Sequence, residues 1–213
     1  MKAVFFDVGE TLVDESRAWT AWADWLGVSA ATLLGLLGAT IARGEDHLHA
    51  FELVRPGFDL QAERRARAAA GVPDEFRAED LYPDALPCLD ALRECGYLVG
   101  VAGNTSADTE AYLRTCCGDA LIASSAGLGA GKPSQEFFRA IAELAGLAPA
   151  AIAYVGDRVD NDVVPALRAG MAAVHVRRGP WGHLQAGGPD ARRATLRVDS
   201  LTELPGALTG TWA

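Results

Sequence analysis

Near its N-terminus the chain reads Lys2-Ala3-Val4-Phe5-Phe6-Asp7-Val8-Gly9-Glu10-Thr11-Leu12. The apolar run before Asp7 predicts a buried strand, and the glycine after it predicts a turn. The Asp7 carboxylate should therefore stand at the C-terminal end of a strand, where open α/β sheets bind ligands. A later strand ends in the same way, Ile152-Ala153-Tyr154-Val155-Gly156-Asp157. Two acids at one sheet edge predict a site for a hard cation, which prefers carboxylate oxygens.

From residue 82 onward, short apolar runs alternate with segments of helical periodicity. Strands are expected at 97–102, 120–123, 152–155, 172–176 and 195–198. Helices are expected at 83–95, 106–116, 133–145 and 161–169, several of them ended by glycine. Strands that alternate with helices predict a parallel sheet with right-handed crossovers. We therefore expect an α/β fold, a Rossmann-like parallel sheet flanked by helices.

Residues 15–81 have a different character. Large apolar side chains recur there every three or four positions, first at Trp19, Trp22 and Leu26 and then at Leu33, Leu37 and Ile41. This spacing predicts helices and no strand. We therefore expect an all-α insertion at 15–81, and an α/β core domain formed by residues 1–14 together with 82–213.

Composition limits the function classes. The 213 residues carry a net charge of -9, and half of them are hydrophobic. The negative charge argues against a nucleic-acid partner, and no apolar run approaches the ~20 residues that span a bilayer. With no signal segment and no zinc-like cysteine spacing, we expect a cytoplasmic protein with reduced cysteines and no membrane partner. One chain does not indicate its oligomeric state.

Two further segments are expected near the same sheet edge. Gly103-Asn104-Thr105-Ser106 follows a predicted strand. Short polar side chains and backbone N–H groups before a helix bind anions, although Ser106 is equally suited to be a plain helix cap. Lys132 lies between Gly131 and Pro133, and a lysine held there can neutralise an anionic substrate. The alternative is a solvated surface lysine.

Three acids follow the strand that ends at Gly156, namely Asp157, Asp160 and Asp162. Mg²⁺ is commonly bound by one or two carboxylates together with substrate phosphate and water, so this cluster favours a magnesium site. The alternative is a solvated helix N-terminus, a position that acids also favour.

Taken together, these motifs resemble the haloacid dehalogenase superfamily of hydrolases. The similarity rests on the strand that ends in Asp7, the small polar turn at 103–106, Gly131-Lys132-Pro133 and the segment 156–162, and it covers nearly the whole chain. It implies that the helical insertion is the small α-helical cap of that family, which closes over the sheet edge.

The resemblance also implies roles for individual residues. Asp7 would be the nucleophile that forms an aspartyl-phosphate, and Asp157 would bind Mg²⁺ together with Asp7 and the backbone carbonyl of Gly9. Lys132 would hold Asp7 and the phosphoryl oxygens. Asp162 would support the metal shell, with Asp160 as the alternative. The phosphate would be bound by Lys132 and by the segment Gly103, Asn104 and Thr105.

The sequence departs from the phosphatases of that family at two positions. Gly9 stands where they have a second Asp that acts as general acid and base, a role worth about 10²–10⁴-fold in rate. Glu10 is adjacent, but its side chain is expected to leave the turn in another direction. Gly103 stands where they have Ser or Thr, so Thr105 or a backbone N–H would have to supply that phosphate contact.

The expected function is therefore a Mg²⁺-dependent phosphatase of a small phosphorylated metabolite, favouring good leaving groups such as acyl phosphates. Gly9 and Gly103 keep open a second possibility, a non-catalytic protein that binds a phosphometabolite or a partner protein. Dehalogenase or phosphonatase chemistry is a third. Dehalogenases need no Mg²⁺, whereas this chain keeps the metal acids. Phosphonatases use a cap lysine, and residues 14–81 contain no lysine.

Overall fold

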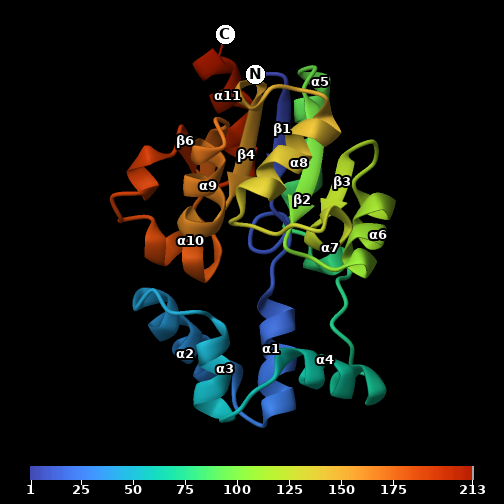
Figure 1. The fold of residues 1–213 in the computed structure, drawn as a ribbon, viewed down its shortest axis with the longest axis vertical. Coiled ribbons are helices and arrows are strands. Elements are labelled where there is room, and N and C mark those ends of the chain that lie inside the picture. Colours follow the sequence, from blue (N-terminus) through green and yellow to red (C-terminus); the bar gives the residue numbers. More distant parts are fainter. Residues whose placement is uncertain (213) are drawn as a thin grey trace. The chain divides into compact units, whose positions relative to one another are not determined.

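The computed structural model describes residues 1–212, and it divides into two compact units (Figure 1). One unit comprises Met1–Asp14 and the residues from Leu81 onward, and the other comprises Glu15–Asp80. Leu81 lies with the first unit because it pairs with Val13 in an isolated antiparallel bridge. The first unit contains the sheet and the second is all helical.

The sheet has six strands in the order β3-β2-β1-β4-β5-β6, and every neighbouring pair is parallel. The strands are β1 (Ala3–Phe6), β2 (Leu98–Gly103), β3 (Leu121–Ser124), β4 (Ile152–Gly156), β5 (Ala172–Val176) and β6 (Leu196–Val198). Every residue of β1 and β4 is buried, as expected of central strands in a parallel sheet covered on both faces. The predicted fold class is confirmed.

The two central strands bring their C-terminal ends together. Phe6 is in register with Val155, and the Asp7 amide donates a 2.8 Å hydrogen bond to the Val155 carbonyl. The chain order reverses at this point, since β1 lies between β2 and β4. Such a switch point is where open α/β sheets bind ligands.

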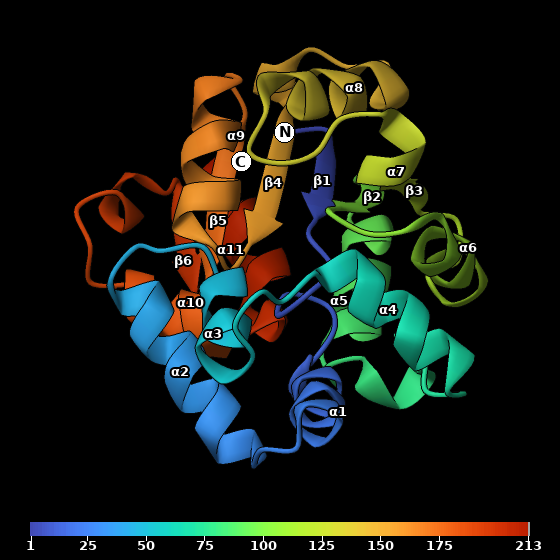
Figure 2. The ribbon, with the colours of Figure 1, turned by 60° about the horizontal axis from the view of Figure 1, so that its bottom comes forward.

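Helices cover both faces of the sheet, as Figure 2 shows. They are α5 (Ala85–Glu94), α6 (Ala107–Cys116), α7 (Ser125–Leu128), α8 (Gln135–Ala145), α9 (Val164–Arg168), α10 (Gly179–Gln185) and α11 (Leu204–Trp212). Ser134 caps α8 by accepting a hydrogen bond from the Phe137 amide, and Gly146 ends the helix in the left-handed conformation. Phe137 and Phe138 then pack edge-on against Tyr154 of β4 and fill the core on that face.

One predicted helix has a different form. Instead of a continuous helix over 161–169, the chain makes a π-type turn at Val159–Val163 before α9 begins at Val164. This turn brings Asp162 back toward the strand end, because the Arg158 amide donates a 2.9 Å hydrogen bond to Asp162 Oδ2.

The second unit consists of α1 (Ser16–Leu26), α2 (Ala30–Ala42), α3 (Leu48–Val54) and α4 (Leu60–Ala69). Ser29 and Asp59 cap α2 and α4 through their side chains. The interior is aromatic: Trp22 packs edge-on against Phe51 and Phe58, which stack on each other. Among residues 1–212 no single helix is long and apolar enough to cross a membrane, and the sharply bent pair α1 and α2 passes that test only by combined length and composition.

Candidate active site

Three predicted acids meet at the C-terminal ends of β1 and β4. Carboxylate oxygens of Asp7, Asp157 and Asp162 all lie within 4.8 Å of one another. All three residues are buried, at 7%, 1% and 1% exposure. Buried charges are costly unless they are paired or bind a cation, so this arrangement requires positive charge nearby.

Lys132 supplies part of that charge. Its Nζ lies 2.6 Å from Asp7 Oδ1 and 2.6 Å from Asp162 Oδ1, and 5.5 Å from the centre of the Tyr154 ring. Burial alone would lower the pKa of Lys132, but the attraction of Asp162 and Asp7 outweighs it and raises the pKa. Lys132 therefore stays charged and bridges the two acids.

Asn104 holds the lysine in place. Its Oδ1 accepts a 2.7 Å hydrogen bond from the Lys132 amide, and its Nδ2 donates a 2.9 Å bond to the Lys132 carbonyl. Both ends of the Asn104 amide are thus bound to the backbone of Lys132. This contact, between residues 28 positions apart, places the lysine beside the strand end.

Asp157 is the acid whose charge is least compensated. Its Oδ2 is buried and has no hydrogen-bond partner among the described residues. Burial, followed by the negative charges of Asp162 and Asp7, raises the pKa of Asp157 well above its usual value. Burial also raises the pKa of Asp162 to about 6, against the opposing effect of Lys132.

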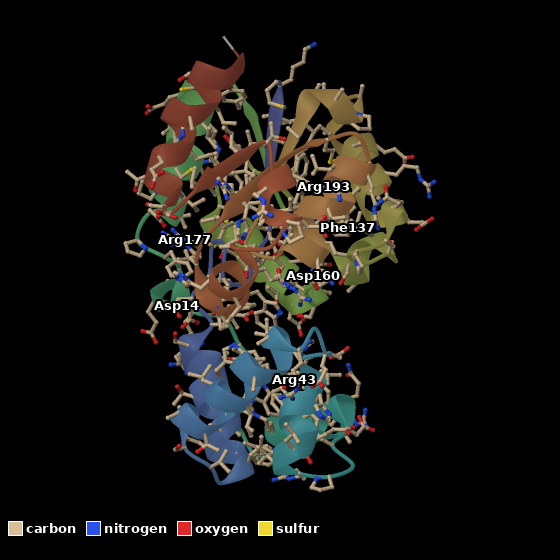
Figure 3. All side chains as sticks on the ribbon, turned by 90° about the vertical axis from the view of Figure 1, so that its left-hand side faces the viewer. Asp14, Arg43, Phe137, Asp160, Arg177 and Arg193 are labelled. Carbon is tan, nitrogen blue, oxygen red and sulfur yellow. The ribbon has the colours of Figure 1, made fainter. Side chains whose placement is uncertain are left out.

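These features fit a divalent cation. The site offers hard carboxylate oxygens, one of them unpartnered, and three negative charges face one lysine. Asp160, whose position is labelled in Figure 3, is not one of the three clustered acids. It pairs with Arg158 at 2.7 Å and accepts a hydrogen bond from Gln185, and its side chain is 52% exposed. Asp160 and Asp162 were the two candidates to support the metal shell, and of these only Asp162 lies beside Asp7 and Asp157.

Two glycines allow this close packing. A Cβ at Gly156 would lie 2.2 Å from Asp162 Oδ2, and a Cβ at Gly103 would lie 2.6 Å from Asp7 Oδ1. Any larger residue at either position would displace the acid beside it. The Oγ1 of Thr105, two residues after Gly103, is buried without a hydrogen-bond partner in the described structure.

The turn after β1 contains a fourth buried acid. Glu10 has φ of 50°, and it is the sole non-glycine residue at positive φ among the described residues. It is 5% exposed, and the Tyr82 hydroxyl donates a 2.6 Å hydrogen bond to its Oε2. Sequence reasoning assigned no role to Tyr82, because its position directly after the helical insertion does not reveal that it reaches back to Glu10.

Comparisons with known proteins agree with this geometry. A family model described as haloacid dehalogenase-like hydrolase matches residues 1–170. A protein of Methanopyrus kandleri named glyceraldehyde 3-phosphate phosphatase is 30% identical over 204 residues, which cover 87% of this chain and 88% of the relative. A protein of Thermus thermophilus named phosphoserine phosphatase is 33% identical over 145 residues, covering 66% of this chain and 58% of the relative.

A solved structure extends the likeness to the whole fold. It is a predicted phosphoglycolate phosphatase from Haemophilus somnus, which matches with a TM-score of 0.71 and 19% identity over 98% of each chain. The family match runs from the strand before Asp7 through the turn that carries Asp162, so the family resemblance and the hydrolase activity inferred from the motifs are confirmed. This chain belongs to the haloacid dehalogenase-like hydrolases.

Proposed function

We propose that this protein is a phosphatase that acts on a small phosphorylated metabolite through an aspartyl-phosphate on Asp7. The observation that carries the proposal is the buried contact of Lys132 with both Asp7 and Asp162 at the end of β1. A carboxylate that attacks phosphorus must approach an anion, and a fixed lysine lowers the repulsion between them. The relatives named as phosphatases support the same reaction class.

The proposal includes a bound divalent cation, for which we propose Mg²⁺. Asp7 and Asp157 would hold it with the backbone carbonyl of Gly9, and the unpartnered Asp157 Oδ2 is the oxygen that most needs it. When bound, the ion supplies Lewis-acid charge stabilisation at the phosphoryl oxygens. Asp162 supports the site indirectly by fixing Lys132.

The reaction then follows from the protein's own groups. An Asp7 oxygen attacks phosphorus in line and the bond from phosphorus to the substrate oxygen breaks, which leaves the phosphoryl group on Asp7. Lys132 stays protonated and contacts the phosphoryl oxygens. Thr105 Oγ1 is the proposed donor that replaces the hydroxyl absent at Gly103. Water then attacks phosphorus, the bond between phosphorus and the Asp7 oxygen breaks, and phosphate leaves while a proton of the water passes to solvent, which regenerates the Asp7 carboxylate.

Gly9 gives a reason to keep a second candidate. It carries no carboxyl to protonate a leaving alkoxide, so hydrolysis of poor leaving groups should be slow. A protein that binds a phosphometabolite without turning it over would need the same lysine and cation site. Substrates with good leaving groups, such as acyl phosphates, separate the two candidates because they need no proton on departure.

The test is hydrolysis of p-nitrophenyl phosphate and acetyl phosphate, each with Mg²⁺ and with EDTA. The wild-type protein should turn over at least one substrate only with Mg²⁺, and Asp7→Asn and Asp157→Asn should each abolish turnover. Asp160→Asn is the matched control, because it removes an acid of the same segment that points to Arg158. Folded wild-type protein with no turnover of either substrate would refute the phosphatase and favour the binding protein.

A further inference from the structure

The backbone of Asp157 lies just past the end of a strand pair. The ladder between β4 and β5 ends with the pair of Gly156 and His175. Asp157 follows Gly156, so its carbonyl is beyond the last paired residue. That carbonyl lies 2.9 Å from Nε2 of His175, and because a carbonyl can only accept, the imidazole donates the hydrogen bond. The His175 ring thus extends the contact between the two strands by one residue, to the acid itself.

This hydrogen bond is shielded from solvent. His175 and Asp157 are each 1% exposed. A buried carbonyl that loses its donor cannot turn to water instead, so either the backbone around it shifts or the fold loses stability. The residue before Asp157 is a glycine, whose backbone is freer than that of any other residue. An anchor directly after Gly156 therefore restricts a backbone that the glycine would leave free.

The three acids of the cluster differ in what holds them. The Asp7 amide donates a hydrogen bond to the end of β4, and the Asp162 carboxylate contacts Lys132 Nζ. Asp157 Oδ2, in contrast, has no hydrogen-bond partner among the described residues. The direction of the Asp157 carboxylate therefore depends on its backbone, which His175 holds.

We propose that His175 is a positioning residue of the cation site, which holds Asp157 through the backbone so that its carboxylate faces the cation. The inference rests on the proposed function in placing a divalent cation against Asp157. Nε2 of His175 is committed to the carbonyl, and the residue acts on the site through Asp157. His175 lies beyond residue 170, where the family match ends, so its role is assigned from the contact and not from that match.

The experiment is a calorimetric titration of the metal-free protein with Mg²⁺. His175→Leu removes the donor and keeps an apolar side chain in the core, and we expect Mg²⁺ to bind about 10-fold more weakly. His175→Gln places an amide nitrogen at the reach of Nε2 and can donate to the same carbonyl, so its affinity should return to near the wild-type value. His175→Asn carries the same amide one carbon shorter and should behave like His175→Leu.

A control in the same strand shows whether a loss comes from β5 as a whole. Thr195 Oγ1 accepts a 3.1 Å hydrogen bond from the amide of Ala173, near the start of β5. Thr195→Val removes this contact with little change of shape, and it should leave the Mg²⁺ affinity unchanged. Circular dichroism and urea unfolding establish that each variant is folded before it is titrated.

The pattern across the variants decides. Wild-type affinity in both His175→Leu and His175→Asn would overturn the proposal, and so would an absence of Mg²⁺ binding by the wild type. A His175→Gln variant as weak as His175→Leu would refute the hydrogen bond as the cause, and an equal loss in Thr195→Val would trace the effect to the strand. If His175→Leu does not fold, the comparison of His175→Gln with His175→Asn decides. Failure of all three to fold would make His175 a core residue only and refute positioning.

Hydrolysis on the same samples separates this inference from the proposed function. A wild-type protein that binds Mg²⁺ with the expected pattern of variants, but hydrolyses neither acetyl phosphate nor p-nitrophenyl phosphate, would refute the phosphatase and leave the role of His175 intact. Mg²⁺-dependent hydrolysis by the wild type, together with unchanged Mg²⁺ affinity in His175→Leu and His175→Asn, would do the reverse.

Discussion

Lys132→Met removes the one buried cation of the acid cluster and keeps most of the apolar stem. Lys132 is 6% exposed, and its Nζ contacts two carboxylates at 2.6 Å each. Removing one partner from a buried ion pair costs about 3–5 kcal/mol, because the remaining charge is left uncompensated. We therefore expect the free energy of unfolding of the metal-free variant to fall by about that amount at pH 8. Lys2→Met is the matched control, since Lys2 is the other lysine of the chain and is exposed.

The pH dependence of this loss has a definite sign. Without Lys132, burial and mutual repulsion hold the pKa values of Asp157 and Asp162 above the ordinary value of about 3.9. The folded variant then binds protons that the unfolded chain releases, so its stability rises as the pH falls. The deficit relative to wild type should shrink by about 1–2 kcal/mol between pH 8 and pH 5.

Urea unfolding in EDTA at both pH values, followed by tryptophan fluorescence and circular dichroism, measures this directly. A deficit below about 1 kcal/mol at pH 8 would mean that Lys132 does not compensate a buried charge. A deficit of full size that does not change with pH would mean that the loss arises from packing and not from the carboxylates. Either result would refute the electrostatic reasoning.

Three further predictions concern the same acids. Gly156→Ala should lower the free energy of unfolding by about 1–3 kcal/mol and abolish turnover, because the new Cβ would lie 2.2 Å from Asp162 Oδ2. Gly187→Ala is the control at an open position and should change neither the stability nor the turnover. Urea unfolding and the phosphatase assay measure the two effects. Relative to Asp162→Asn, the metal-free wild type should lose stability as the pH rises through about 6, the pKa to which Asp162 is raised, with calorimetry as the measurement. Mg²⁺ at 100 times its dissociation constant should stabilise the wild type by about 2.7 kcal/mol in thermal unfolding and leave Asp157→Asn unchanged.

The acids at the strand ends could be predicted because local patterns specify them. A fully apolar run such as residues 3–6 can be buried on both faces only as a central parallel strand, so the acid that follows must lie at the sheet edge. The same logic applies to Asp157 after β4. The alternation of strands with helices that end at glycine was enough to predict the order of the strands along the chain, and the three-to-four spacing of large apolar side chains predicted the helical insertion between β1 and β2.

The details of the site depend on distances between segments, which a single sequence does not contain. Asp160 and Asp162 are equivalent by composition, and only the π-type turn at Val159–Val163 directs one toward Lys132 and the other toward Arg158. Asn104 is predicted to contact phosphate because it follows a strand, and that stays a prediction. The structure shows a contact of its amide with the Lys132 backbone, across 28 residues, that no local pattern indicates.

The structure gives a packing reason for Gly103, which stands where the phosphatases of the family have Ser or Thr. A side chain there would occupy the space of Asp7 Oδ1, the oxygen that contacts Lys132. The glycine thus permits a direct Asp7–Lys132 contact. At the neighbouring turn, Glu10 takes the left-handed conformation that glycine adopts at no cost, and Tyr82 and Gly179 accommodate the carboxylate.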